Sequence, residues 1–324
     1  MSQPDDQAEL LRSALSPQVQ ARLQSLRLKG GIAIAVLDAG GLDGAGRTSL
    51  EAAVKQALTG QPGVSDVRVA LTADKRGRRI IAVGSGKGGV GKSTVSANLA
   101  VSLAAMGRKV GLVDADIYGP SQPLLLGSDG TKPEARENKL IPVPTKWGVP
   151  LLSMGQLIAP DKAIAWRGPM VGNALGQLID AEWGEVDLLI VDLPPGTGDV
   201  QLTMLQRYKP AGAVIVSTPQ DLALIDAKRA IQLFEIGDVP IVGMVENMAG
   251  YACPHCGEVS DPFGSGGTEA AAGAMNLPFL GRIPLQLAIR EASDAGTPPA
   301  AGEGPAAEAF RAIATRLANW LDNQ

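Results

Sequence analysis

The sequence predicts an α/β protein in which a smaller α/β unit precedes a mostly parallel, doubly wound sheet. Three observations lead to this fold class. From residue 80 onward, strand-like apolar runs alternate with helix-like patterns, as in sheets covered by helices on both faces. A glycine-rich loop separates the first of these runs from the helical pattern after it. Ahead of them, two further runs enclose one helical pattern. We therefore expect a small domain at 1–74, a charged linker at 75–79 and the main domain at 80–324.

The elements of this fold are expected in the following order. Roughly the first 25 residues carry an amphipathic helical pattern, which Pro17 interrupts. A βαβ-like unit follows, with strands at 31–37 and 64–71 around a helix at 48–58. The main domain has expected strands at 80–83, 109–113, 150–154, 187–191, 213–217, 241–246 and 278–281, and expected helices at 94–106, 171–181, 222–234 and 305–321. In such sheets, ligands bind at the carboxyl ends of the strands.

The composition favours a cytoplasmic protein without a nucleic-acid or membrane partner. The 324 residues include 29 basic and 33 acidic side chains, for a net charge of −4, so no overall charge attracts the chain to nucleic acid or membrane. No apolar run approaches the roughly 18 residues of a membrane span. Only two cysteines occur, which excludes a disulfide framework.

A phosphate-binding loop is the clearest motif. Residues 86–93 fit the pattern Gly-x-x-x-x-Gly-Lys-Ser between a strand and a helix. Glycines let backbone N–H groups turn toward phosphates, and the start of the helix adds partial positive charge. Lys92 would reach the β- and γ-phosphates, and the Ser93 hydroxyl would bind Mg²⁺. The residues expected to contact the nucleotide here are Gly86, Lys87, Gly88, Gly89, Val90, Gly91, Lys92, Ser93 and Thr94. Such a loop needs one lysine only, so Lys87 requires a separate explanation.

Carboxylates follow two of the expected strands. Asp114 and Asp116 come after the run at 110–113, and Asp192 comes after the run at 188–191. Asp192 is the candidate for the Mg²⁺ side of the nucleotide, as the Walker B aspartate. Asp116 is the candidate for positioning the attacking water, and Asp114 for the outer shell of the metal. A helix cap or turn is the alternative role for any single aspartate of this kind. Asn247 could read a purine edge through its amide, or simply form a turn.

The two cysteines form a Cys-x-x-Cys motif, Cys253 and Cys256, which can place two thiolates on one metal centre. Zinc and iron–sulfur centres generally take four protein ligands. The chain has no other cysteine, and His255 is its single histidine. The simplest solution is a site shared by two chains on a two-fold axis, each supplying its cysteine pair. A structural thiol pair or a redox couple is the alternative.

Together these motifs resemble a known family. Residues 87–94 resemble the deviant Walker A motif of the MinD, ParA and nitrogenase iron-protein class. With the motifs at 114–121, 166–170, 192–199 and 253–256, the chain resembles the Mrp/ApbC iron–sulfur carrier ATPases over about residues 78–290.

This resemblance implies a homodimer that hydrolyses ATP slowly and holds a 4Fe-4S cluster between subunits at Cys253 and Cys256. The cluster would come from an assembly scaffold and pass to apo iron–sulfur proteins. The resemblance also implies that Lys87 contacts phosphate across the dimer interface. It places Asp116 beside the hydrolytic water and Asn247 at the adenine.

Two alternatives stay open at this point. A MinD/ParA-like positioning ATPase would need a basic amphipathic tail or a basic patch, and residues 305–324 supply neither. An ATPase dimer could instead hold a structural zinc at the same cysteines.

Bacterial relatives often carry a small N-terminal α/β domain with an Asp-Pro-Glu motif and a reactive cysteine. Residues 37–41 offer neither, and the alternative to a cluster-handling role for this unit is the docking of partners.

Overall fold

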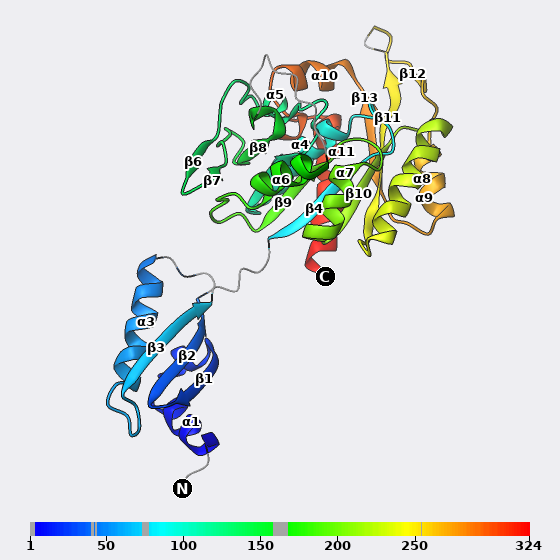
Figure 1. Cartoon of the computed structure of the whole chain (residues 1–324). Coiled ribbons are helices and arrows are strands. Elements are labelled where there is room, and N and C mark those ends of the chain that lie inside the picture. The colour runs from blue at the N-terminus through cyan, green and yellow to red at the C-terminus, as the bar shows by residue number, and fades with distance from the viewer. Residues whose placement is uncertain (1–3, 40–41, 43, 73–77, 158–167, 254) are drawn as a thin grey trace. The chain divides into compact units, whose positions relative to one another are not determined.

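The computed structural model describes residues 4–39, 42, 44–72, 78–157, 168–253 and 255–324. The chain divides into two compact units, Met1–Gly77 and Arg78–Gln324 (Figure 1). Of the linker expected at 75–79, residues 75–77 lie outside the described residues, and Arg79 begins a strand of the second unit. No helix among the described residues is long and apolar enough to cross a membrane.

The first unit has a three-stranded sheet in the order β1-β2-β3. Strand β2 (Ile32–Asp38) is parallel to β3 (Asp66–Thr72), and helix α3 (Gly44–Leu58) connects them. This confirms the predicted βαβ arrangement. Strand β1 (Leu23–Lys29) pairs with β2 antiparallel.

The helical pattern predicted for about the first 25 residues is interrupted before Pro17, as expected, but the prediction was wrong from Leu23 onward, where strand β1 begins. Helix α1 covers Pro4–Ser13, and a new short helix, α2, begins at the proline and covers Pro17–Gln20. The chain then turns into β1, because Leu26 and Leu28 alternate with exposed polar residues. Leu26 joins Leu11, Leu15 and residues of α3 in the core of this unit.

The second unit is built on one large sheet. Among the described residues it has eight strands, in the order β12-β11-β10-β4-β9-β5-β8, with β13 beside β11. The bounds are β4 Arg79–Gly84, β5 Val110–Asp114, β8 Leu151–Ser153, β9 Leu188–Asp192, β10 Gly212–Ser217, β11 Ile241–Ala252, β12 Val259–Ser260 and β13 Phe279–Leu285. Only β12 pairs antiparallel in this sheet. All seven predicted strands of the main domain are therefore present, in the predicted mostly parallel sheet.

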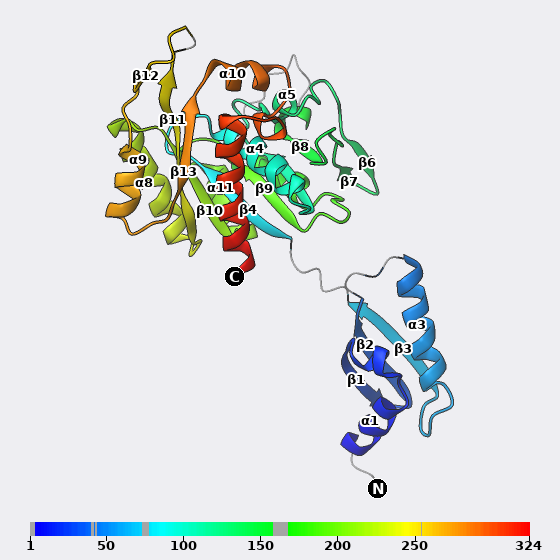
Figure 2. The ribbon, with the colours of Figure 1, turned by 180° about the vertical axis from the view of Figure 1, so that it is seen from behind.

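Helices cover both faces of the sheet, as predicted for a doubly wound fold. Helices α4 (Lys92–Ala105) and α11 (Pro305–Asp322) pack on one face (Figure 2), in a core that includes Leu99, Phe310 and Leu317. Helices α6 (Gly168–Ile179) and α8 (Asp221–Ile236) pack on the other face, in a second core. Where the structure describes this unit, the other α-helices are α5 Gln122–Leu125, α7 Asp199–Thr203, α9 Gly267–Ala274 and α10 Leu287–Asp294, and there are short 3₁₀- or π-helices at Met154–Leu157, Met204–Tyr208 and Pro299–Ala301.

The sequence patterns missed several short elements. The hairpin β6 (Glu134–Arg136) and β7 (Lys139–Ile141), strand β12 and helices α9 and α10 are at most eight residues long. Elements of this length carry too few residues for a clear period. Of the motif at 166–170, residues 166 and 167 lie outside the described residues.

Candidate functional site

The carboxyl ends of three neighbouring strands bring the predicted site residues together. Strand β4 leads into the glycine-rich loop, and β9 lies between β4 and β5. Asp192, the last residue of β9, is in register with Val83 of β4 and with Asp114, the last residue of β5. Two carboxylates from distant parts of the sequence therefore lie on the same side of the loop, at the carboxyl ends of β9 and β5.

The glycine-rich loop, residues 85–91, has a backbone that favours glycine at three positions, Gly86, Gly89 and Gly91, and φ is +82° at Gly89. A Cβ atom on Gly86 would lie 1.9 Å from the carbonyl carbon of Asp226 in α8. Gly91 has φ +82° and directly precedes α4, where a side chain would be strained. The loop borders an open cleft of about 360 Å³, to which Lys87, Ser93 and other residues contribute. This is the placement expected of a phosphate-binding loop.

Lys92 is buried and paired with carboxylates. Its side chain is 6 % exposed, and Nζ lies 2.6 Å from Oδ1 of Asp192 and 3.8 Å from Oδ2 of Asp116. Nζ also donates to Oγ of Ser93 at 3.4 Å. A phosphate that reaches this ammonium group must therefore compete with Asp192 for it.

Asp192 is fully buried and is held by residues that the sequence did not indicate. Its Oδ1 also accepts a hydrogen bond from Oγ of Ser96 at 2.9 Å, and its Oδ2 accepts one from Nε2 of Gln122 at 2.8 Å. The same Nε2 donates to the backbone oxygen of Ser93 at 2.9 Å. Gln122 thus ties the strand-end carboxylate to the first turn of α4, while its own Oε1 is buried with no hydrogen-bond partner.

Asp114 organises the segment that leads to α5. Its Oδ2 accepts hydrogen bonds from Oγ of Ser153 at 2.9 Å, from the N–H of Ser121 at 3.0 Å and from the N–H of Gln122 at 3.1 Å. Burial, and next the charge of Asp192, raise the pKa of Asp114 to about 7. These contacts are those of a turn-forming and capping residue, the alternative considered for a strand-end aspartate.

Asp116 lies closer to the open cleft, which it lines. Its Oδ1 accepts hydrogen bonds from the N–H groups of Tyr118 and Gly119, both at 3.2 Å. These bonds fix the carboxylate while its Oδ2 faces Lys92. Lys87 lines the same cleft with an exposed side chain, so it is accessible to a second molecule.

Asn247 lies within β11 and not at its end, because the strand continues to Ala252. Its Nδ2 donates to the backbone oxygen of Val90 at 2.8 Å, and the same atom would be 2.1 Å from a Cβ on Gly91. The side chain is therefore packed against the glycine-rich loop and holds it in place.

The two cysteines lie in the turn between β11 and β12, whose pairing joins Ala252 to Val259. The N–H of Cys253 donates to the oxygen of Glu258, and the N–H of Gly257 donates back to the oxygen of Cys253, both at 2.9 Å. Cys253 is partly buried and Cys256 is exposed. The backbone N–H of Cys256, and next that of His255, lower the pKa of the Cys253 thiol, which favours the thiolate that binds metals.

Within the part of the chain that the structure describes, no group of three or more His, Cys, Asp and Glu side chains could hold a metal ion. The thiol pair of one chain therefore needs further ligands from elsewhere to complete a four-ligand centre.

A model of the ParA family, described as NUBPL iron-transfer P-loop NTPase, matches residues 76–318. The chain belongs to this family. An iron–sulfur cluster carrier protein of Methanocaldococcus jannaschii is 46 % identical over 75 % of this chain and 85 % of its own length. A protein of the same name from Escherichia coli is 44 % identical over 81 % of this chain and 69 % of its own.

Two solved structures share the fold of this iron-transfer NTPase. A nucleotide-binding protein from Archaeoglobus fulgidus, in complex with ADP, has a TM-score of 0.60 and 42 % identity over 68 % of this chain and 86 % of its own. The cell-division ATPase MinD of Pyrococcus furiosus has a TM-score of 0.56 and 28 % identity over 75 % of this chain and 99 % of its own. The predicted resemblance and the P-loop NTPase fold are both confirmed.

Proposed function

We propose that this chain is an ATP-hydrolysing carrier of iron–sulfur clusters, with the cluster as its cargo. The observation that carries the proposal is a Cys-x-x-Cys turn, with Cys253 partly buried and Cys256 exposed, on the same unit as the glycine-rich loop of a chain that belongs to an iron-transfer NTPase family. Relatives 44–46 % identical carry the name iron–sulfur cluster carrier protein, which supports it.

For the nucleotide, we assign ATP and Mg²⁺ to the cleft beside residues 86–94. The loop amides and Lys92 bind the phosphates, and Ser93 binds Mg²⁺. Asp192 would contribute to the outer shell of the hydrated ion, because Lys92, Ser96 and Gln122 already donate hydrogen bonds to the carboxylate oxygens of Asp192. Asp114, whose oxygens accept several hydrogen bonds, orients the loop at 116–121 and belongs to the outer shell. Mg²⁺ would neutralise phosphate charge during hydrolysis.

For hydrolysis, we assign Asp116 to the attacking water, because among the three carboxylates at or just after the ends of β5 and β9 it is the one that lines the cleft. The exposed Lys87 acts across the interface of a homodimer. Asn247 holds the nucleotide loop through Val90, and contact with adenine is its second role in this proposal.

For the cargo, two chains each supply Cys253 and Cys256 and hold one 4Fe-4S cluster on the two-fold axis. The proposal needs the dimer because each chain has only two cysteines and such clusters are held by four thiolates. The carrier receives the cluster from an assembly scaffold and delivers it to apo-proteins.

The test is anaerobic reconstitution with iron and sulfide, followed by iron and sulfide analysis, visible absorption and light-scattering mass. The wild type should bind one cluster per dimer, while Cys253→Ala and Cys256→Ala should bind almost none. His255→Ala is the matched control in the same turn and should keep its cluster. Equal cluster content in the cysteine variants and the wild type would contradict the proposal.

A structural zinc at the same cysteines is the second candidate, favoured by the same thiol geometry. Metal analysis of protein purified without oxygen separates the two. Stoichiometric zinc that iron and sulfide do not displace would replace the carrier proposal.

A further inference from the structure

Strand β2 of the N-terminal unit has an unusual distribution of side chains between its two faces. Ala33, Ala35 and Leu37 point toward the helices and are completely buried. The opposite face carries the residues that alternate with these, which are Ile32, Ile34 and Val36. Ile34 is 36 % exposed there. A sheet with one solvated face normally alternates apolar inside and polar outside. Here the face away from the helices carries the β-branched side chains.

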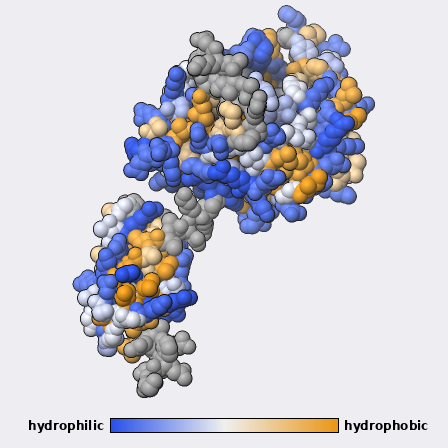
Figure 3. Space-filling model, in the orientation of Figure 1, coloured by the Kyte–Doolittle hydropathy of each residue, from blue (hydrophilic) through white to orange (hydrophobic). Residues whose placement is uncertain are grey.

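The neighbouring strands frame this apolar row with charge. Ile34 is in register with Arg27 of β1 and with Arg68 of β3. In the next row, Ile32 is in register with Lys29 and Asp66. All four charged side chains are exposed, and Arg68 lies 3.7 Å from Asp66. Figure 3 shows an apolar patch on this unit with hydrophilic side chains around it.

The dimensions of the row fit one helix. Residues two apart on a strand are about 6.7 Å apart, close to the rise of about 6 Å between helix residues i and i+4. Adjacent strands are about 4.8 Å apart, so the backbones of Arg27 and Arg68 are separated by about 10 Å, the width of one helix. A helix lying along β2 would have its apolar stripe on Ile32, Ile34 and Val36, and its two flanks over the arginines.

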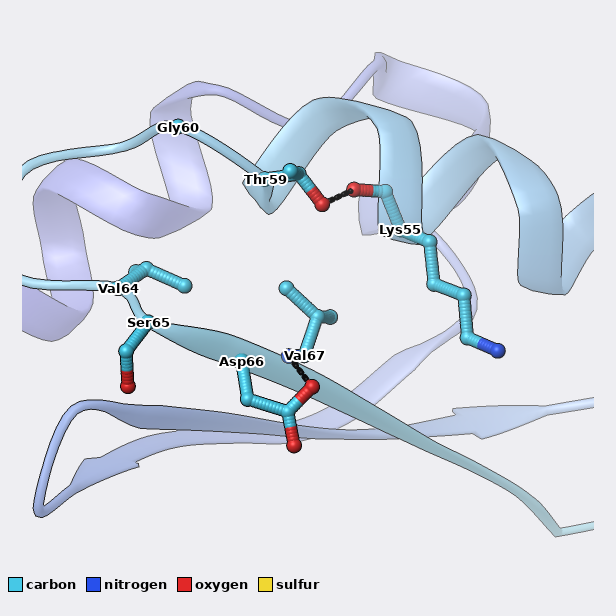
Figure 4. Close-up of a pocket in the computed structure, with 7 residues that line it drawn as sticks. All are labelled: Lys55, Thr59, Gly60, Val64, Ser65, Asp66 and Val67. Carbon is cyan, nitrogen blue, oxygen red and sulfur yellow. Dashed lines mark hydrogen bonds between the residues drawn. The ribbon is translucent and has the colours of Figure 1, made fainter.

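We propose that this open sheet face binds an amphipathic helix of a partner protein, with acidic residues on both sides of its apolar stripe. The charges argue against a second copy as the occupant, because two stacked faces would bring Arg27 and Arg68 near the same residues of the partner. The covered face of the sheet carries α3 instead. Figure 4 shows the cleft beside α3, where Val64 and Val67 lie between helix and strand. Ser65 also lines this cleft, and its hydroxyl donates a hydrogen bond to the backbone oxygen of Gly31.

The proposal is tested with the full-length chain and fluorescent synthetic helices of about 18 residues, long enough to cover the row. One peptide has a leucine stripe flanked by glutamates, a matched one has lysines in their place, and a third has alanines in place of the stripe. By fluorescence anisotropy, the glutamate peptide should bind at least about tenfold more tightly than either control, and the difference should shrink in high salt.

The variants locate the binding. Ile34→Asp should weaken binding of the glutamate peptide by at least about tenfold. Ile34→Thr keeps a β-branched side chain and should also weaken this binding, so it serves as the test if the aspartate variant does not fold. Arg27→Glu with Arg68→Glu should reverse the preference to the lysine peptide. Leu10→Asp, at an exposed leucine of α1, should change nothing.

Equal binding of glutamate and lysine peptides would overturn the proposal, and so would equal effects of Ile34→Asp and Leu10→Asp. A dimer in sedimentation velocity that Ile34→Asp dissociates would assign the face to a second copy instead. None of these outcomes depends on cluster content, so this proposal stands or fails separately from the carrier function.

Discussion

Replacing Lys92 by methionine should destabilise the second unit strongly in the absence of nucleotide. Asp192 is fully buried, and its Oδ1 lies 2.6 Å from Nζ of Lys92. Methionine keeps most of the stem but leaves that carboxylate without its cation, beside the equally buried Asp114. Removing one partner of a buried pair costs about 3–5 kcal/mol. In a unit of this size, that corresponds to a fall in Tm of about 6–20 °C.

Tryptophan fluorescence can follow this unit by itself, because all four tryptophans of the sequence lie after residue 78. The double variant Lys92→Met with Asp192→Asn should recover most of the lost stability, since the asparagine carries no charge. Lys109→Met is the matched control: its ion pair with Glu185 is exposed, and such pairs contribute little. A Tm for Lys92→Met equal to that of the control, or no recovery in the double variant, would refute the reasoning.

Three further predictions concern the nucleotide cleft. Lys87→Ala should bind ATP nearly as tightly as the wild type in calorimetry but should release phosphate from ATP far more slowly, whereas Lys92→Met should lose ATP binding. A similar loss of ATP affinity in both variants would contradict a role of Lys87 across the dimer interface. Gly86→Ala should abolish nucleotide binding, because its Cβ would meet α8 at 1.9 Å, whereas Gly88→Ala has its nearest neighbour at 3.8 Å and should bind. Gln122→Leu should lower the free energy of unfolding by about 1–3 kcal/mol, because Asp192 loses a buried donor; an unchanged urea midpoint would argue against this.

The sequence predicted the features that leave a local pattern. Strand ends followed by Asp114 and Asp192, and the glycines of residues 86–91, are each readable within a few residues, and parallel topology then brings them together. Gln122 could not be predicted in this way, because its partner Asp192 is 70 residues away. Ser96 follows Lys92 by one helical turn, a spacing that could have indicated it.

Errors arose where pairing between strands, and not the local pattern, decides the structure. Leucines 23, 26 and 28 suit a helical stripe and a strand almost equally, and pairing with β2 decides for the strand. For Asn247, the apolar run ends at Val245, but pairing with β12 and β13 extends β11 to Ala252. Tertiary contacts, absent from any window of sequence, determine both outcomes.

Strand β11 connects the glycine-rich loop to the cysteine turn through one piece of backbone. Within the strand, Asn247 donates a hydrogen bond to the backbone oxygen of Val90, and Cys253 directly follows the last residue of the strand. Between them, Met248 has φ +59° and Gly250 φ +74°, and the pairing with β13 shifts register before Tyr251. A few such residues can absorb a large change in φ and ψ. The cysteine turn therefore follows a strand that is hydrogen-bonded to the glycine-rich loop at Asn247, and the two left-handed residues Met248 and Gly250 lie between that bond and the thiols.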